Sequence, residues 1–92
     1  MAYIKIPTPL RQYTGNQAEV AIRGATVDEA LRDLVARYPA LAPHLYEGDD
    51  LRSFVNIFLG DEDIRFLQDL ATPLTEDARL RIIPAIAGGT SS

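Results

Sequence analysis

Two adjacent glycines near the carboxyl end carry the most specific chemistry in this chain. Gly88 and Gly89 follow the apolar stretch 82–87 and precede Thr-Ser-Ser at positions 90–92. Glycine has no side chain, so a Gly-Gly arm can thread a narrow channel and bring its backbone close to another protein's reactive centre. A carboxylate at Gly89 would then be the reacting group, and the rest of the chain would serve to present it.

The three residues after the glycines bear directly on that chemistry. While residues 90–92 are attached, Gly89 ends in a peptide bond and has no carboxylate to activate. We therefore expect a precursor that a protease cuts between Gly89 and Thr90, because small polar residues suit such a cut. Two other interpretations stay open: residues 90–92 are a cloning remnant, or the glycines are only a frayed terminus.

Other reactive groups are sparse. The chain has no cysteine, which excludes disulfides, thiolate catalysis and cysteine-based metal sites. His44 is the single histidine, and we expect it at the surface or packed in a loop. The acidic runs at 47–50 and 60–63 lack the spacing of a calcium loop and predict solvated turns. No set of nucleophile, base and orienting residue is present, so we predict no catalytic residue and no metal site.

Composition limits the kinds of partner and the cellular compartment that we expect for this chain. A chain of 92 residues makes one domain. The net charge of −4 disfavours nucleic acid and anionic membranes and makes a basic partner more natural. The start of the chain does not resemble a signal peptide, and no apolar run approaches the length of a membrane span, so we expect the cytoplasm.

The first half of the chain predicts a hairpin followed by a helix. Apolar and polar residues alternate at 3–6 and 18–22, and Gly15-Asn16 between them can adopt positive φ. Thr26 and Glu29 form a capping box at the start of a helix that Pro39 ends. The apolar stripe of that helix consists of Val27, Ala30, Leu31, Leu34, Val35 and Tyr38.

The second half predicts three strands. After a connection anchored by Leu41 and Leu45, strands are expected at 54–59, 64–66 and 79–86. One helix must then cover one face of a mixed sheet of four to five strands. This order predicts an α+β fold, the ubiquitin-like β-grasp, over residues 1–87, with residues 88–92 as a flexible tail.

Alternation also places apolar side chains on the outward face of the sheet. Phe58 and Ile83 face outward on two strands, next to the outward Arg81. A single exposed apolar residue is normal, but two on adjacent strands, with Arg81, predict a patch where a partner docks. Arg65, Arg79 and Arg81 could steer an acidic partner, and solvated strand charges are the simpler interpretation.

Three stretches carry a resemblance that extends over nearly the whole chain to Gly89: IPTPLRQYTG, FVNIFLGDEDIRF and LATPLTEDARLRIIPAIAGG. With them the sequence resembles the MoaD/ThiS family of bacterial ubiquitin-like sulfur carriers, and most of all its CysO-type members. The last stretch is the specific one, since a bare Gly-Gly is common.

The resemblance implies a protein cosubstrate and not an enzyme. A ubiquitin-activating-like adenylyltransferase would use ATP and Mg to convert the Gly89 carboxylate into an acyl-adenylate, and sulfur would replace AMP to give a thiocarboxylate. Ile86, Ala87 and Gly88 would thread into that enzyme. A JAMM-type metalloprotease would make the cut before Thr90, and the carrier itself would bind no cofactor.

The resemblance also implies a sulfur-accepting synthase. In the CysO-type route this partner is cysteine-synthase-like, and the product is cysteine or a related sulfur-containing metabolite. The alternative is a non-carrying binding module, such as a molybdopterin-synthase-like small subunit that inserts its tail into a larger partner.

Overall fold

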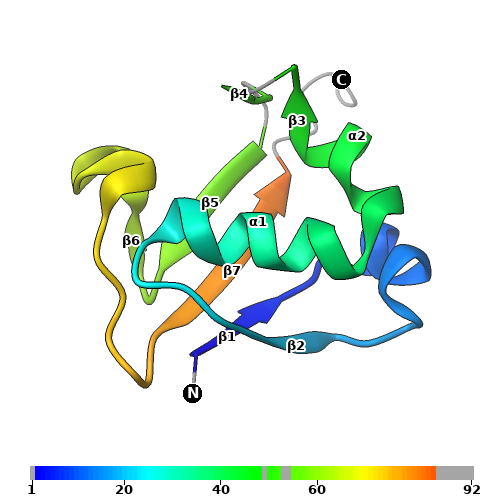
Figure 1. Ribbon diagram of the computed structural model, residues 1–92, viewed down its shortest axis with the longest axis horizontal. Helices are drawn as coiled ribbons and strands as arrows, with labels where there is room; N and C mark the ends of the chain where they lie inside the picture. The colour runs from blue at the N-terminus through cyan, green and yellow to red at the C-terminus, as the bar shows by residue number, and fades with distance from the viewer. Residues whose placement is uncertain (1, 49, 53–54, 85–92) are drawn as a thin grey trace.

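The computed structural model describes residues 2–48, 50–52 and 55–84. Its main layer is a five-stranded sheet in the order β2-β1-β7-β5-β6 (Figure 1). The strands are β1 (Ala2–Lys5), β2 (Glu19–Ile22), β5 (Val55–Leu59), β6 (Glu62–Asp63) and β7 (Arg79–Pro84). The β1–β7 pairing is parallel and the other pairings are antiparallel, so the sheet is mixed, as the sequence predicts.

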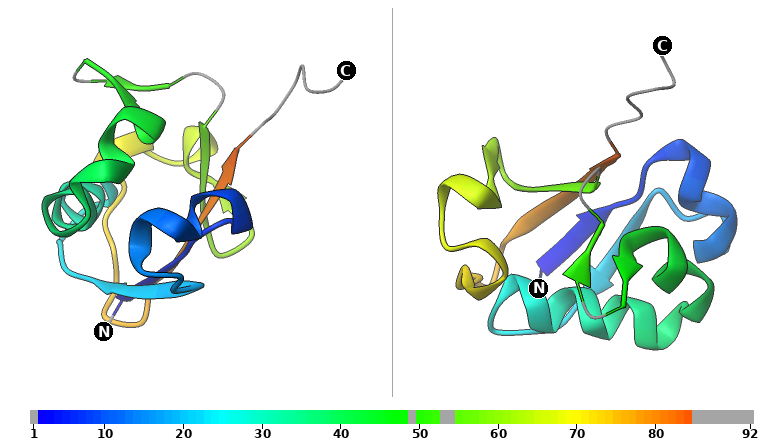
Figure 2. Two further views of the ribbon diagram at one scale, coloured as in Figure 1. Left: turned by 90° about the vertical axis from the view of Figure 1, so that its right-hand side faces the viewer. Right: turned by 90° about the horizontal axis from the view of Figure 1, so that it is seen from above.

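One face of the sheet is covered by α1 (Val27–Arg37), which crosses the strands (Figures 1 and 2). The inward residues of the strands and the apolar stripe of the helix form one core, in which Ile4, Leu31 and Leu80 are almost fully buried. Val35 and Tyr38 lie at its margin. Burial of this apolar area is the main force that joins the two layers.

The start of α1 follows the predicted capping pattern with a shift of one residue. The Thr26 hydroxyl accepts a hydrogen bond from the Glu29 amide at 3.3 Å. The Glu29 carboxylate accepts one from the amide of Ala25 at 3.0 Å, where a standard capping box would use Thr26. Two amide groups near the helix start are thereby satisfied.

The segments between these elements contain structure that the sequence did not reveal. A 3-10 helix, η1 (Thr8–Thr14), follows β1, and its buried Thr14 hydroxyl lies 3.1 Å from the carbonyl oxygens of Arg11 and Gln17. After it, Gly15 and Asn16 adopt positive φ, as expected.

The long connection after α1 is also folded. It consists of η2 (Pro39–Leu41), the short helix α2 (Ala42–Leu45) and a small second sheet of β3 (Tyr46–Glu47) and β4 (Asp50–Leu51). Leu41 and Leu45 are fully buried, so their predicted role as anchors is confirmed. The small sheet was not predicted.

The predicted strand at 64–66 is wrong. The strand lies two residues earlier, in β6, and residues 64–66 form the 3-10 helix η3 (Ile64–Phe66). Gly60 has φ of 63°, which permits a tight turn directly into β6. The Asp63 carboxylate then accepts a hydrogen bond from the Arg65 amide at 2.9 Å, and this cap starts the helical turn. A further 3-10 helix, η4 (Asp69–Ala71), lies before β7.

Two predicted strands continue beyond what the structure describes. The strand at 54–59 is found as β5, with Val55 and Ile57 buried as expected and Leu59 packed against the core. The strand at 79–86 is found up to Pro84. Phe54, residues 85–87 and the predicted tail 88–92 lie outside the described residues, so the boundary at residue 87 stays a prediction.

Gly24 fixes how closely the chain turns from β2 into α1. A Cβ atom on Gly24 would lie 2.5 Å from the Ala30 amide nitrogen, which belongs to the helix backbone and cannot swing away. We therefore expect Gly24→Ala to lower the free energy of unfolding by about 1–3 kcal/mol. Urea denaturation measures this change.

Gly48→Ala is the control for Gly24→Ala. Gly48 has φ of 68° and nothing within 4 Å of an added Cβ, so only the backbone conformation is penalised. Its expected cost is about 1 kcal/mol. A Gly24→Ala protein as stable as the original would show that the β2–α1 turn is not closely packed.

Candidate docking face and carboxyl-terminal arm

The predicted reacting arm follows β7. Ile86, Ala87, Gly88, Gly89 and Thr90 lie outside the described residues, so threading, activation and cleavage at these positions stay predictions. What the structure shows is the base of the arm. The last described residue, Pro84, is paired with Val55 at the end of β7.

The position of β7 makes that base rigid. The strand lies in the middle of the sheet, with β1 on one side and β5 on the other (Figure 1). Its inward residues Leu80 and Ile82 are buried in the core, as predicted. β1 pairs with β7 as far as Arg81 and β5 pairs with it as far as Pro84, so any arm that continues from Pro84 starts from a strand end held by β5, two residues after the buried Ile82.

The outward face of β7 brings the predicted docking residues together. Phe58 on β5 is directly opposite Arg81, and Asn56 is opposite Ile83. The Arg81 guanidinium carbon lies 5.8 Å from the centroid of the Phe58 ring, which is a cation–π distance. The side chain of Ile83 is diagonal to Phe58 and is 37% exposed, so the apolar part of the patch is open to solvent.

Hydrogen bonds hold the arginines of this face in place. Arg81 donates to the Gly60 carbonyl oxygen at 3.2 Å and lies 3.7 Å from the Asp61 carboxylate. Arg65 donates to the side-chain oxygen of Asn56 and pairs with Asp63 at 3.1 Å. These contacts are exposed, so they order the side chains more than they stabilise the fold.

A second group of charges lies toward the β2 side of the same face. The Arg79 guanidinium is 5.1 Å from the Tyr3 ring centroid and 3.1 Å from the Glu19 carboxylate. Lys5 is opposite Arg81 across the β1–β7 pairing. The face therefore carries several cations next to its apolar residues.

The sequence did not single out Arg11 as a functional residue. Together with Lys5, Arg81 and Ile83 it lines a shallow hollow of about 400 Å³ beside the end of β7. Its Nε donates to the Ile6 carbonyl oxygen at 3.0 Å. Arg11 reaches this position through η1, a helix that no sequence pattern indicated.

His44 takes no part in this face. It is exposed in α2 and stacks on Tyr13 of η1, with 4.4 Å between ring centroids and 27° between planes. The expected surface position is therefore confirmed, although His44 lies in the short helix α2 and not in a loop. Within residues 2–48, 50–52 and 55–84, no group of three or more His, Asp or Glu residues could hold a metal ion. No helix in that part of the chain is long and apolar enough to cross a bilayer.

Comparison with known proteins decides the family, because the ThiS family model matches residues 4–89. The chain belongs to the ThiS family. It is 39% identical over 89 residues to the sulfur carrier protein CysO of Mycobacterium tuberculosis, with 94% of this chain and 96% of the relative covered. The resemblance to MoaD/ThiS proteins of the CysO type is thereby confirmed.

Solved structures confirm the ubiquitin-like β-grasp fold. The CysO chain in a BexX/CysO complex from Amycolatopsis orientalis superposes with a TM-score of 0.88 at 36% identity, covering 97% of this chain and 100% of that one. The small archaeal modifier protein 1 of Methanosarcina acetivorans gives 0.86 at 29% identity, covering 96% of this chain and 95% of that one.

The Tyr13–His44 stack links η1 to α2, and its loss has a small expected cost. We expect His44→Ala to lower the free energy of unfolding by about 0.5–1.5 kcal/mol and His44→Phe, which keeps an aromatic ring, to change it less. Thermal denaturation compares the two variants. Equal stability of His44→Ala and the original protein would show that the stack contributes nothing.

Proposed function

We propose that this protein is a sulfur carrier whose reacting group is the carboxylate of Gly89. The observation that carries the proposal is the family match, which extends to the second glycine, together with the identity to CysO over almost the whole chain. Within the described residues, β7 supports it physically, because a reactive arm needs a fixed base and β7 provides one. The carrier is a cosubstrate of other enzymes in this proposal.

The carboxylate has to be activated before sulfur can replace its oxygen. In the proposed step a carboxylate oxygen of Gly89 attacks the α-phosphorus of ATP, with Mg and a ubiquitin-activating-like adenylyltransferase, and pyrophosphate leaves. Hydrosulfide then attacks the acyl carbon and displaces AMP, and loss of its proton leaves a thiocarboxylate. The carrier binds no cofactor of its own, and we propose that these steps take place in the cytoplasm.

Residues 90–92 must be removed first. Hydrolysis of the Gly89–Thr90 peptide bond by a JAMM-type metalloprotease would expose the carboxylate. A cysteine-synthase-like enzyme would then supply an activated serine-derived carbon, which the thiocarboxylate sulfur attacks as the activating group leaves. Hydrolysis by a JAMM-type metalloprotease would free cysteine or a related metabolite and return the Gly89 carboxylate.

We propose that these partners dock on the outward face of the sheet, at Phe58, Ile83 and Arg81. The helix covers the opposite face, so a partner can reach the end of β7 from this side without displacing any element. We also propose that cations of this face meet acidic groups of the partner, with Arg65, Arg79 and Arg81 exchanging their present pairing with Asp63, Glu19 and Asp61. Four of the nine Lys and Arg residues gather there in a chain whose net charge is −4: Lys5, Arg65, Arg79 and Arg81.

The chemistry is tested on protein that ends at Gly89. Incubated with the cognate activating enzyme, ATP, Mg and a sulfur source, it should gain the mass difference between one sulfur and one oxygen atom, read by intact mass spectrometry. Protein that ends at Ser92 should show no gain in the same mixture, because Gly89 is then held in a peptide bond. A competent enzyme that leaves the shorter protein unchanged would refute the proposal.

The docking face is tested by adding a charge to its apolar part. Ile83→Asp should raise the KM of the activating enzyme for the carrier roughly tenfold or more, because a charge in the centre of an apolar contact must be desolvated. Phe66→Asp is the matched control. Phe66 is 81% exposed on η3, and the same change there should leave KM within about twofold. Equal KM values for both variants would place the docking site elsewhere.

A further inference from the structure

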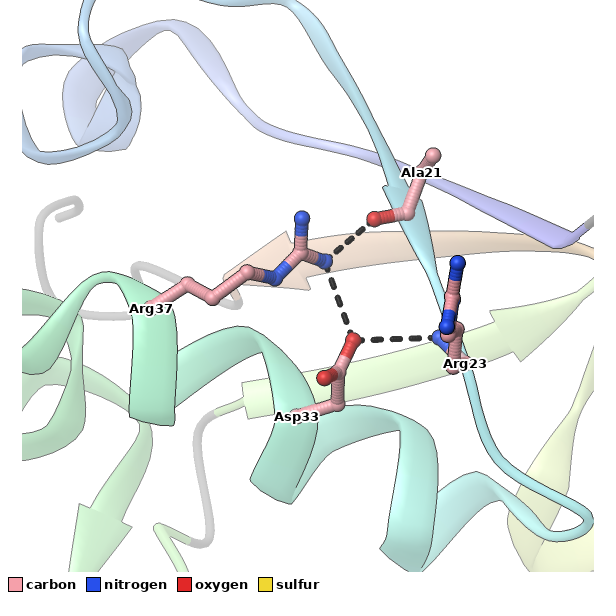
Figure 3. Close-up of a pocket in the computed structure, with 4 residues that line it drawn as sticks. All are labelled: Ala21, Arg23, Asp33 and Arg37. Carbon is pink, nitrogen blue, oxygen red and sulfur yellow. Dashed lines mark hydrogen bonds and ion pairs between the residues drawn. The ribbon is translucent and has the colours of Figure 1, made fainter.

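Among the strands that the structure describes, β2 pairs only with β1, so its outer edge is a free sheet edge. Such an edge presents backbone N–H and C=O groups that another strand can pair with, and natural sheets protect it. In this protein the protection comes from the helix. Figure 3 shows Asp33 and Arg37 of α1 reaching across to the backbone of Ala21 and Arg23.

The hydrogen bonds between α1 and the backbone of residues 21 and 23 are linked through the side chains of Asp33 and Arg37. The Asp33 carboxylate accepts a hydrogen bond from the Arg23 amide at 3.1 Å. The Arg37 guanidinium donates to the Ala21 carbonyl oxygen and pairs with the same Asp33 oxygen at 3.0 Å. These four residues line a hollow of about 380 Å³ between β2 and α1.

Asp33 and Arg37 together supply the one hydrogen-bond acceptor and one donor that a residue of a neighbouring strand would supply to β2. In a parallel pairing, each bonded residue donates its N–H to one carbonyl and accepts from the N–H two residues further along the neighbouring strand. The Ala21 carbonyl and the Arg23 amide are two residues apart. Arg37 supplies the donor and Asp33 supplies the acceptor, so the ion pair occupies the bonding position of an incoming strand.

The edge is complementary to a second copy of itself. If two β2 strands paired antiparallel about Ala21, Glu19 of each copy would lie opposite Arg23 of the other. Opposite charges facing each other across strands are favourable, and a two-fold arrangement satisfies both pairs at once. The small side chain of Ala21 would lie at the centre.

We infer that the Asp33–Arg37 pair is a guard that keeps this edge of β2 from pairing with β2 of a second copy, and that the protein is monomeric because of it. The inference is independent of the proposed sulfur chemistry, because it concerns only α1 and β2. Removing the guard leaves the Ala21 carbonyl and the Arg23 amide without protein partners at an edge that matches its own copy.

The test compares two double variants of the full chain. Asp33→Ala with Arg37→Ala removes the guard. Asp28→Ala with Arg32→Ala removes an ion pair of the same residue types and spacing from the same helix, next to Tyr46 rather than β2. Net charge is unchanged in both. In sedimentation velocity over a range of concentrations, the first variant should shift from monomer to dimer, whereas the second variant and the original protein should stay monomeric.

Two further measurements make the outcome specific to β2. Hydrogen exchange of the Arg23 amide should become roughly fivefold faster or more in monomeric, dilute samples of the guardless variant, as the loss of one charge-assisted hydrogen bond implies. Adding Arg23→Glu to that variant places like charges opposite Glu19 and should restore the monomer.

The inference fails if the guardless variant is folded and monomeric at every concentration, or if the original protein is a dimer. It also fails if Arg23→Glu leaves the dimer intact, because pairing through β2 about Ala21 would then be wrong. If the double variant does not fold, Arg37→Ala alone carries the same test, since it frees the Ala21 carbonyl and keeps the Asp33 contact to Arg23.

Discussion

The pairing of β7 on both sides is the constraint on which the rest of this structure depends. The strand is bonded in parallel to β1 and antiparallel to β5, and Leu80 and Ile82 anchor it in the core. Up to Arg81, β7 cannot fray without breaking two ladders and exposing apolar area, and its last residues are paired with β5. The last described residue thus ends a strand from the interior of the sheet, and the proposed function places its reactive arm directly after that strand.

The side chains of β7 point alternately to the two faces of the sheet, and these faces have different roles. Alternation turns Leu80 and Ile82 toward α1 and turns Arg81 and Ile83 away from it. The apolar side chains of α1 pack against the inner face of the sheet and bury it, and the side chains of the outer face lie outside the core. It holds a cation–π pair, an exposed isoleucine and ordered arginines beside the end of β7. Glu19, Asp61 and Asp63 pair with three of the four cations there, so this face is less acidic than the chain as a whole, whose net charge is −4.

The parts that could be predicted from the sequence are those with local or periodic signals. The 3.6-residue stripe and the Thr26 cap located α1, and two-residue alternation located β5 and β7 together with the outward Phe58 and Ile83. The error at 64–66 arose because three apolar-rich residues fit a strand and a short helix equally well, and the Asp63 cap decided between them. The place of Arg11 in the hollow beside β7 and the contact of Arg37 with β2 join residues far apart in the chain, and no spacing in the sequence indicates them.

Both edges of the five-stranded sheet are protected against pairing with another strand, whereas its outer face is open. β6 is only two residues long and gives an incoming strand little to pair with, and β2 is covered by the side chains of Asp33 and Arg37. In the proposed function the protein meets several partners in turn, and strand addition at either edge would compete with their docking. Contacts through the outer face rely on side chains, which can be formed and broken without rearranging the backbone. The same sheet thus offers side chains to partners on its outer face and leaves little backbone at its two edges for another strand to pair with.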